Sequence, residues 1–158
     1  MTQHVDTTGH ECVFCAIAAG RAEASVVHED EHVVVFTDLH PVTRGHLLVV
    51  PRAHAVGLED LDPTTGVHVW SVARTMARAL RRSRLGCEGI NLLLCDGEAA
   101  YQTVFHLHLH VIPRYARDGW SSLTAVPPQR DRSALDDDAR LVRDALVEAG
   151  ASRTDGPA

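Results

Sequence analysis

Residues 106–110 read His-Leu-His-Leu-His, and two further apolar residues follow them. In a β-strand, alternate side chains lie on the same face, about 6.5–7 Å apart. We therefore predict a strand over 104–113 with one apolar face and one face lined by imidazoles. Burying three imidazoles without partners would cost free energy, so this pattern predicts a functional site rather than ordinary core.

Two kinds of chemistry suit three imidazoles on one face. Alternate histidines on a strand can converge on one zinc ion, as in a mononuclear metalloenzyme. Alternatively, one neutral imidazole can act as a nucleophile near pH 7 while its neighbours hold it in place. The residue types alone leave both readings open.

Cys12 and Cys15 form a C-x2-C pair, a spacing typical of half a zinc site or of a redox pair. Cys87 and Cys95 stand alone beside apolar segments, and we expect both to be buried. A chain of 158 residues can form its own hydrophobic core, so a disulfide framework is not expected.

Four segments together resemble the histidine triad (HIT) family. The His-Leu-His-Leu-His-Val-Ile segment is similar to the family's signature, and residues 45–54 resemble its Gly-His-x-Leu-Val-x-Pro-x-x-His stretch. Residues 36–41 resemble its nucleotide-binding segment, and the C-x2-C pair followed by an apolar helix resembles the start of bacterial members. The four occur in the family's order from about residue 12 to 114, which is most of the chain.

The resemblance implies hydrolysis or transfer of nucleotidyl groups through a covalent nucleotidyl-histidine. By position, His108 would be the nucleophile, His110 would donate to the phosphate oxygens or the leaving group, and His46 would support both from the adjacent strand. Gln102 and Thr103 correspond to the polar pair that contacts phosphate oxygens in the family.

The resemblance also implies a nucleoside pocket. Asp38 would accept hydrogen bonds from the ribose hydroxyls, for which a carboxylate is suited. Phe14, Phe36 and Leu39 would line the site of the base. The alternatives are a turn residue before Pro41 for the aspartate, and core packing for the two phenylalanines.

Several bacterial relatives bind zinc at positions that correspond to Cys12, Cys15, His54 and His106. The resemblance therefore implies a closed, structural Cys2His2 zinc site, with no metal required for the chemistry itself. As a zinc ligand, His106 would belong to the catalytic site by supporting His108, not by donating a proton. A reduced C-x2-C pair without metal is the alternative.

We therefore expect a HIT-type hydrolase that cleaves purine nucleotidyl (AMP-X) substrates at phosphorus–nitrogen or phosphoric anhydride bonds. Nucleoside phosphoramidates and dinucleoside polyphosphates are the substrate classes implied. The alternatives are a non-catalytic nucleotide-binding module with a structural zinc, and a nucleotidyltransferase, although that branch carries glutamine near the position of His110. Cys95 and Tyr101 stand where the family often has asparagine and glycine, so the leaving group and the nucleobase stay open.

The elements that must position these residues follow from hydrophobic periodicity and helix caps. Asp62 and Pro63 are a favourable helix start, and apolar residues then recur at helical spacing. The predicted helices cover 13–19, 63 to about 86, and 133–150; the predicted strands cover 25–28, 32–38, 47–50, 90–94 and 104–113. We expect an α+β fold: a HIT-like antiparallel sheet of about five strands, with a long inserted helix and a C-terminal helix. A flexible N-terminus (1–10), a HIT domain (11–150) and a flexible tail (151–158) complete the expected organisation.

Composition narrows the remaining classes. Hydrophobic residues make up 45% and charged residues 23%, as in a globular protein, and no apolar run approaches the ~18 residues of a membrane helix. The net charge of −6 argues against non-specific nucleic-acid binding, and the polar N-terminus predicts a cytoplasmic protein. The resemblance implies a homodimer formed through the sheet edge and the helix that carries Trp70 and Met76; the alternative for Trp70 is core packing.

Overall fold

The computed structural model describes residues 11–120 and 128–154, which form an α+β fold around one antiparallel sheet. The order of the five strands in the sheet is β1-β2-β3-β5-β4. They are β1 (Val26–Glu29), β2 (Val33–Thr37), β3 (Leu47–Pro51), β4 (Gly89–Leu94) and β5 (Leu109–Arg114). The predicted fold class is confirmed: a long helix, α2 (Pro63–Arg82), is inserted between β3 and β4, and α3 (Arg132–Thr154) is C-terminal.

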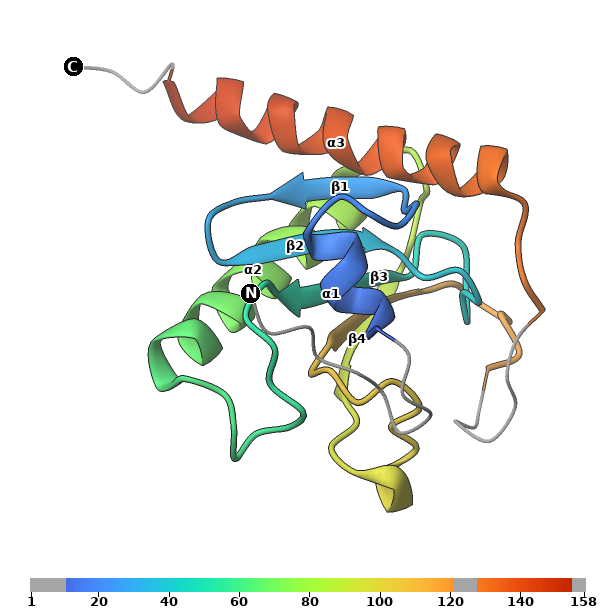
Figure 1. The fold of residues 1–158 in the computed structure, drawn as a ribbon. Coiled ribbons are helices and arrows are strands. Elements are labelled where there is room, and N and C mark those ends of the chain that lie inside the picture. The colour runs from blue at the N-terminus through green and yellow to red at the C-terminus, as the bar shows by residue number, and fades with distance from the viewer. Residues whose placement is uncertain (1–10, 121–127, 155–158) are drawn as a thin grey trace.

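The sheet separates two apolar layers, because side chains alternate along each strand. Val33, Val35 and Val49 belong to the core shared with α2 and α3. Val34 and Phe36 face the other way, toward the short helix α1 (Val13–Ala18), which lies over the opposite face of the sheet (Figure 1). The α1 face of the sheet is therefore the one that carries the site described below.

The long helix begins as its caps predict. The Asp62 carboxylate accepts a hydrogen bond from the Thr65 N–H at 2.9 Å, and Pro63 occupies the first turn. Met76 is 1% exposed and belongs to the core, so this residue of the helix is not accessible to a second subunit. Trp70, by contrast, is 59% exposed, which rules out the core alternative for that residue.

Three predicted boundaries are wrong by several residues. The long helix ends at Arg82 rather than near Gly86. The last strand begins at Leu109 rather than Val104, because the Leu107 N–H pairs with the Ala55 carbonyl (2.7 Å) instead of with a neighbouring strand. The last helix continues to Thr154, past the predicted stop at Gly150 and into the predicted tail. One glycine destabilises a helix by only about 1 kcal/mol, and the alanines on either side of Gly150 are strong helix formers, so the helix continues. The predicted flexible segment 1–10 and the rest of the predicted tail, 155–158, lie outside the described residues.

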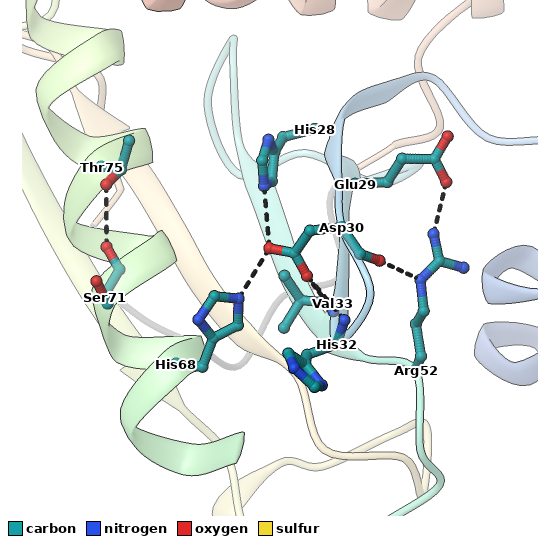
Figure 2. A network of polar contacts seen from close by, with 9 residues as sticks. All are labelled: His28, Glu29, Asp30, His32, Val33, Arg52, His68, Ser71 and Thr75. Carbon is teal, nitrogen blue, oxygen red and sulfur yellow. Dashed lines mark hydrogen bonds and ion pairs between the residues drawn. The ribbon is translucent and has the colours of Figure 1, made fainter. Parts of the chain in front are cut away.

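One carboxylate ties the β1–β2 hairpin to α2 (Figure 2). Asp30 accepts from the backbone N–H groups of His32 and Val33 on one oxygen, at 2.8 and 2.9 Å. Its other oxygen lies 2.8 Å from His68 Nε2 on α2 and 3.3 Å from His28 Nε2 on β1. Burial alone would raise the pKa of this carboxyl, but the hydrogen bonds hold it well below its usual range. The tether thus fixes the start of the sheet against the long helix.

Within the described ranges, no helix is both long enough and apolar enough to cross a bilayer.

Candidate functional site

A cavity of about 390 Å³ opens on the α1 face of the sheet, at the ends of the central strands. Most of the predicted catalytic and substrate-binding residues line it: Phe14, Phe36, Asp38, Leu39, His46, Thr103, His108 and His110. Two do not. Gln102 is buried behind the wall of the cavity, and His106 points into a separate cluster of cysteines and histidines.

His108 is held in one tautomer. Its Nδ1 lies 2.7 Å from the backbone carbonyl of His106, and a carbonyl can only accept, so Nδ1 carries the proton. Burial lowers the pKa of this imidazole, although the same hydrogen bond and the Asp38 charge oppose the shift. His108 is therefore neutral near pH 7, with its lone pair on Nε2, in a side chain that lines the cavity. This is the state of an imidazole that can attack an electrophile.

A second chain of contacts fixes His110 in the opposite tautomer. The Val42 N–H donates to His46 Nδ1 at 3.1 Å, so the proton of a neutral His46 must lie on Nε2. That Nε2 is 2.9 Å from His110 Nδ1, which therefore accepts. A neutral His110 then carries its proton on Nε2 and can donate it into the cavity. His46 and His110 are neutral because burial, followed by the charges of neighbouring imidazoles, lowers both pKa values, that of His46 to about 3.

Asp38 lies beside these two neutral rings but forms no hydrogen bond with either of them. One of its oxygens accepts from the His40 N–H at 2.9 Å, which fixes the carboxylate. The other oxygen lies 3.6 Å from His46 Nδ1 and 4.0 Å from His110 Nδ1, longer than a hydrogen bond. Since the Asp38 side chain is 19% exposed and lines the cavity, this oxygen can accept from a bound ligand.

The apolar part of the cavity lies beside His108. The rings of Phe14 and Phe36 meet edge to face, 5.5 Å apart, and Phe14 also meets His108 at 5.1 Å. Both phenylalanines belong to the core beneath α1 and line the cavity at once, so the two predicted roles are compatible. Leu39 is 37% exposed at the same cavity.

Gln102 does not contact the cavity, in contrast to its predicted place beside the phosphate. Its side-chain carbonyl accepts from the Gly97 N–H at 2.7 Å, and its amide donates to the carbonyls of Val56 (2.7 Å) and Val104 (3.2 Å). With these three bonds made and only 3% of the residue exposed, Gln102 braces the loop between β4 and β5. The neighbouring Thr103 does line the cavity.

The sequence analysis did not identify one backbone group and two side chains at the cavity. The Val42 N–H that sets the His46 tautomer is a backbone group, so no residue pattern reveals it. Trp120 and Arg132 also line the cavity, from beyond β5 and from the start of α3. The arginine is charged and the tryptophan is stacked by the Arg114 guanidinium, 4.7 Å from its ring centre.

Cys12, Cys15, His54 and His106 form a second cluster, with one potential ligand atom from each lying within 4.8 Å of the others. His106 Nε2 lies 2.9 Å from the Pro51 carbonyl and so carries the proton. The unprotonated Nδ1 of His106 therefore faces the sulfurs of Cys12 and Cys15, at 3.4 and 3.5 Å. His54 Nδ1 is 3.3 Å from the Cys15 sulfur.

The donor set of this cluster suits a zinc ion. Two sulfurs and two imidazole nitrogens are a common closed tetrahedral set, and the carbonyl that holds His106 is a typical support for a metal-bound imidazole. Burial, and then the neighbouring Cys12, raise the pKa of the Cys15 thiol to about 12, so a Cys15 thiolate needs a cation beside it. Because the His106 ring belongs to this cluster, the three triad histidines do not converge on a single metal, and that alternative is wrong.

A family model, curated sequences and solved structures that are similar to this chain all carry the same domain. The HIT domain family matches residues 19–117. A HIT-like protein of Mycobacterium tuberculosis is 39% identical over 91% of this chain and 99% of its own length. Adenylylsulfatase HINT3 of Arabidopsis thaliana is 34% identical over 73% of this chain and 59% of its own length. The crystal structure of a Zn-bound histidine triad family protein from Mycobacterium smegmatis superposes with a TM-score of 0.77, at 41% identity, over 89% of this chain and 96% of that one.

Proposed function

Because the chain belongs to the histidine triad (HIT) family, we propose that it is a nucleotide hydrolase that releases AMP from AMP-X substrates through a covalent intermediate on His108. The observation that carries this proposal is the pair of opposite tautomers in one cavity. His108 has its lone pair on Nε2, whereas His110 has its proton on Nε2. A nucleophile and a hydrogen-bond donor thus stand side by side, with ring centres 4.8 Å apart.

In the first step, the Nε2 lone pair of His108 forms a bond to the α-phosphorus. The bond between phosphorus and X breaks, and X leaves with that electron pair and takes up a proton from solvent. The His110 Nε2–H donates to a phosphate oxygen on which negative charge grows. The His108 Nδ1–H keeps donating to the His106 carbonyl, and this hydrogen bond stabilises the positive charge that the substituted imidazole acquires.

In the second step, water replaces the histidine. The water oxygen bonds to phosphorus, the nitrogen–phosphorus bond breaks, and its electron pair returns to His108 Nε2. The water proton goes to solvent, so the net reaction is AMP-X plus water giving AMP and HX. Every proton position needed before attack is already set by the three contacts that fix the tautomers.

The nucleoside would lie on the β2 side of the histidines. There Asp38 offers an oxygen for the ribose hydroxyls, and Phe14, Phe36 and Leu39 offer an apolar surface for the base. The name of the Arabidopsis relative, adenylylsulfatase, supports AMP-X as the substrate class.

We further propose that the Cys12, Cys15, His54 and His106 cluster holds one zinc ion. When bound, the zinc would supply a structural cross-link between α1 and the segment that precedes β5, and it would take no part in the reaction. Through His106 the cluster supports the active site, because the carbonyl of that residue accepts from His108 Nδ1. The Mycobacterium smegmatis relative, which is Zn-bound, supports this assignment.

A homodimer is the third part of the proposal. Val67 and Trp70 are 73% and 59% exposed on α2, and β4 is an edge strand of the sheet. An exposed tryptophan and an open strand edge each favour association with a second copy of the chain.

The function is tested by measuring AMP release and AMP binding in parallel. Adenosine 5′-phosphoramidate is incubated with the wild type, with His108→Asn and with His32→Gln, a control in an exposed histidine. We expect His108→Asn to lose at least ~10³-fold in AMP release, as removal of a nucleophile does, and to keep its affinity for AMP. Turnover by His108→Asn would refute His108 as the nucleophile, whereas AMP binding by a wild type that releases none would replace the hydrolase with the binding module.

A further inference from the structure

Tyr101 adopts a backbone conformation that favours glycine. Its φ is 66°, and within 11–120 and 128–154 only Arg117 is another non-glycine residue with positive φ. An L side chain in this left-handed region costs free energy, and such residues persist only where the surrounding structure holds them.

The loop around Tyr101 supplies that support. A short 3-10 helix, η1 (Glu98–Ala100), precedes Tyr101, whose N–H donates to the Glu98 carbonyl at 2.9 Å. The next residue, Gln102, turns inward and is fixed by its three side-chain hydrogen bonds. The left-handed turn thus sends Gln102 into the protein and Tyr101 out of it, and a glycine would make the same turn with less strain.

The side chain of Tyr101 contributes little to the core. The residue is 55% exposed, yet it lines the cavity that holds His108 and His110. Of the other aromatic residues at this cavity, Phe14 and Phe36 are buried in the core, and Trp120 is stacked by Arg114. Tyr101 therefore offers an accessible ring on a rigid loop, and a fixed exposed aromatic is preorganised for stacking.

The loop that carries Tyr101 follows the strand that lies on the far side of the histidines from Phe36. In the order β2-β3-β5-β4, the strand that carries Phe36 lies on one side of the histidines, and β4 lies on the other. Leu93 pairs with His110, and Leu93, Cys95 and Tyr101 form a wall of the cavity that belongs to β4 and to the loop after it. A substrate with its base on the β2 side and its α-phosphate at His108 would extend its leaving group toward this wall.

We propose that Tyr101 selects the leaving group of the reaction, by stacking on a planar aromatic ring carried by X. This inference rests on the proposed function and names the substrate class more closely: AMP joined to a group that bears an aromatic ring. An aromatic amine in a phosphoramidate and the second base of a dinucleoside polyphosphate share this chemistry.

Two pairs of substrates test the inference and separate the two sources. The first pair is AMP linked through nitrogen to tryptamine or to propylamine, and the second is diadenosine tetraphosphate or adenosine tetraphosphate. In each pair, kcat/KM for the aromatic substrate is divided by kcat/KM for its partner. The pair in which the ratio depends on Tyr101 identifies the source of the ring.

The variants are chosen so that backbone strain stays matched. Tyr101→Leu and Tyr101→Phe keep an L side chain at positive φ, so the loop is strained alike in both. We expect Tyr101→Leu to lower the aromatic ratio by roughly three- to tenfold in at least one pair, and Tyr101→Phe to retain it. Tyr101→Gly should lose the preference while its Tm rises, because glycine relieves the strain.

The inference is overturned if Tyr101→Leu leaves both ratios unchanged, or lowers kcat/KM equally for both members of each pair. A ratio that falls in Tyr101→Phe as much as in Tyr101→Leu also overturns it, since the ring would then be irrelevant. A wild type that releases AMP from none of the four substrates refutes the proposed function itself, and the inference falls with it.

Discussion

Acid should destabilise this protein through His46, a buried imidazole that folding keeps neutral. His46 is 1% exposed, and burial, followed by the charge of His108, lowers its pKa from 6.5 to about 3. The unfolded chain therefore binds a proton below about pH 6.5 that the folded chain excludes, so the free energy of unfolding falls as the pH falls. The contribution of His46 to the free energy of unfolding is fully present above pH 6.5, and it is lost as the pH falls from 6.5 toward the folded-state pKa of about 3.

The magnitude follows from these two pKa values. Between about pH 7.5 and about pH 5, the linkage relation gives a loss of about 2 kcal/mol from His46 alone, within a total stability that is typically 5–15 kcal/mol. Asp30 contributes nothing in this window. Its pKa is lowered from 3.8, so its stabilisation is lost only at more acidic pH.

Urea denaturation at the two pH values measures this loss, at fixed protein concentration and with zinc present. The comparison is between wild type, His46→Leu and the exposed-histidine control His32→Gln. We expect His46→Leu to be less stable near neutral pH, because Val42 and His110 lose their partner, but to lose about 2 kcal/mol less on acidification. Equal losses in wild type and His46→Leu, to within ~0.5 kcal/mol, would refute the conclusion that burial keeps this imidazole neutral.

Three further predictions concern the metal, the tether and the dimer. Elemental analysis should find one zinc per chain in wild type and in Cys87→Ser but none in Cys15→Ser, and a chelator should lower Tm; a metal-free wild type would contradict the assignment. Asp30→Ala should lower the free energy of unfolding by about 1–3 kcal/mol in urea, because two backbone N–H groups and His68 lose their acceptor; an unchanged midpoint would show that the tether is dispensable. Trp70→Glu should sediment as a monomer while Val147→Glu, equally apolar and exposed on α3, stays dimeric; a wild-type monomer would exclude the dimer.

The sequence predicted helices and strands well where contacts between neighbouring residues determine them. The cap at Asp62 and the helical spacing of apolar residues mark α2, and apolar alternation marks the two-faced strands. The failures occur where distant contacts decide. The start of β5 depends on the pairing of Leu107 with Ala55, a carbonyl 52 positions away that no local pattern indicates.

The site was predicted at the level of residue types, but its arrangement was not. The alternation of residues 106–110 alone suggested three imidazoles in one row, and the family resemblance was needed to expect His106 beside the cysteines and His46 beside His110, as the structure has them. Gln102 was expected at the phosphate from the family resemblance, yet its polar groups are all used inside the loop. Tautomers, and the φ of Tyr101, depend on backbone geometry and cannot be read from residue types.

The central claim is that His108 carries the nucleotidyl group during turnover. Intact-protein mass spectrometry tests it most directly, after brief mixing with adenosine 5′-phosphoramidate and quenching above neutral pH, where the nitrogen–phosphorus bond survives. The account predicts an adduct of one AMP on the wild type that is absent from His108→Gly. An adduct that persists in His108→Gly, or AMP release with no adduct at any mixing time, would contradict it.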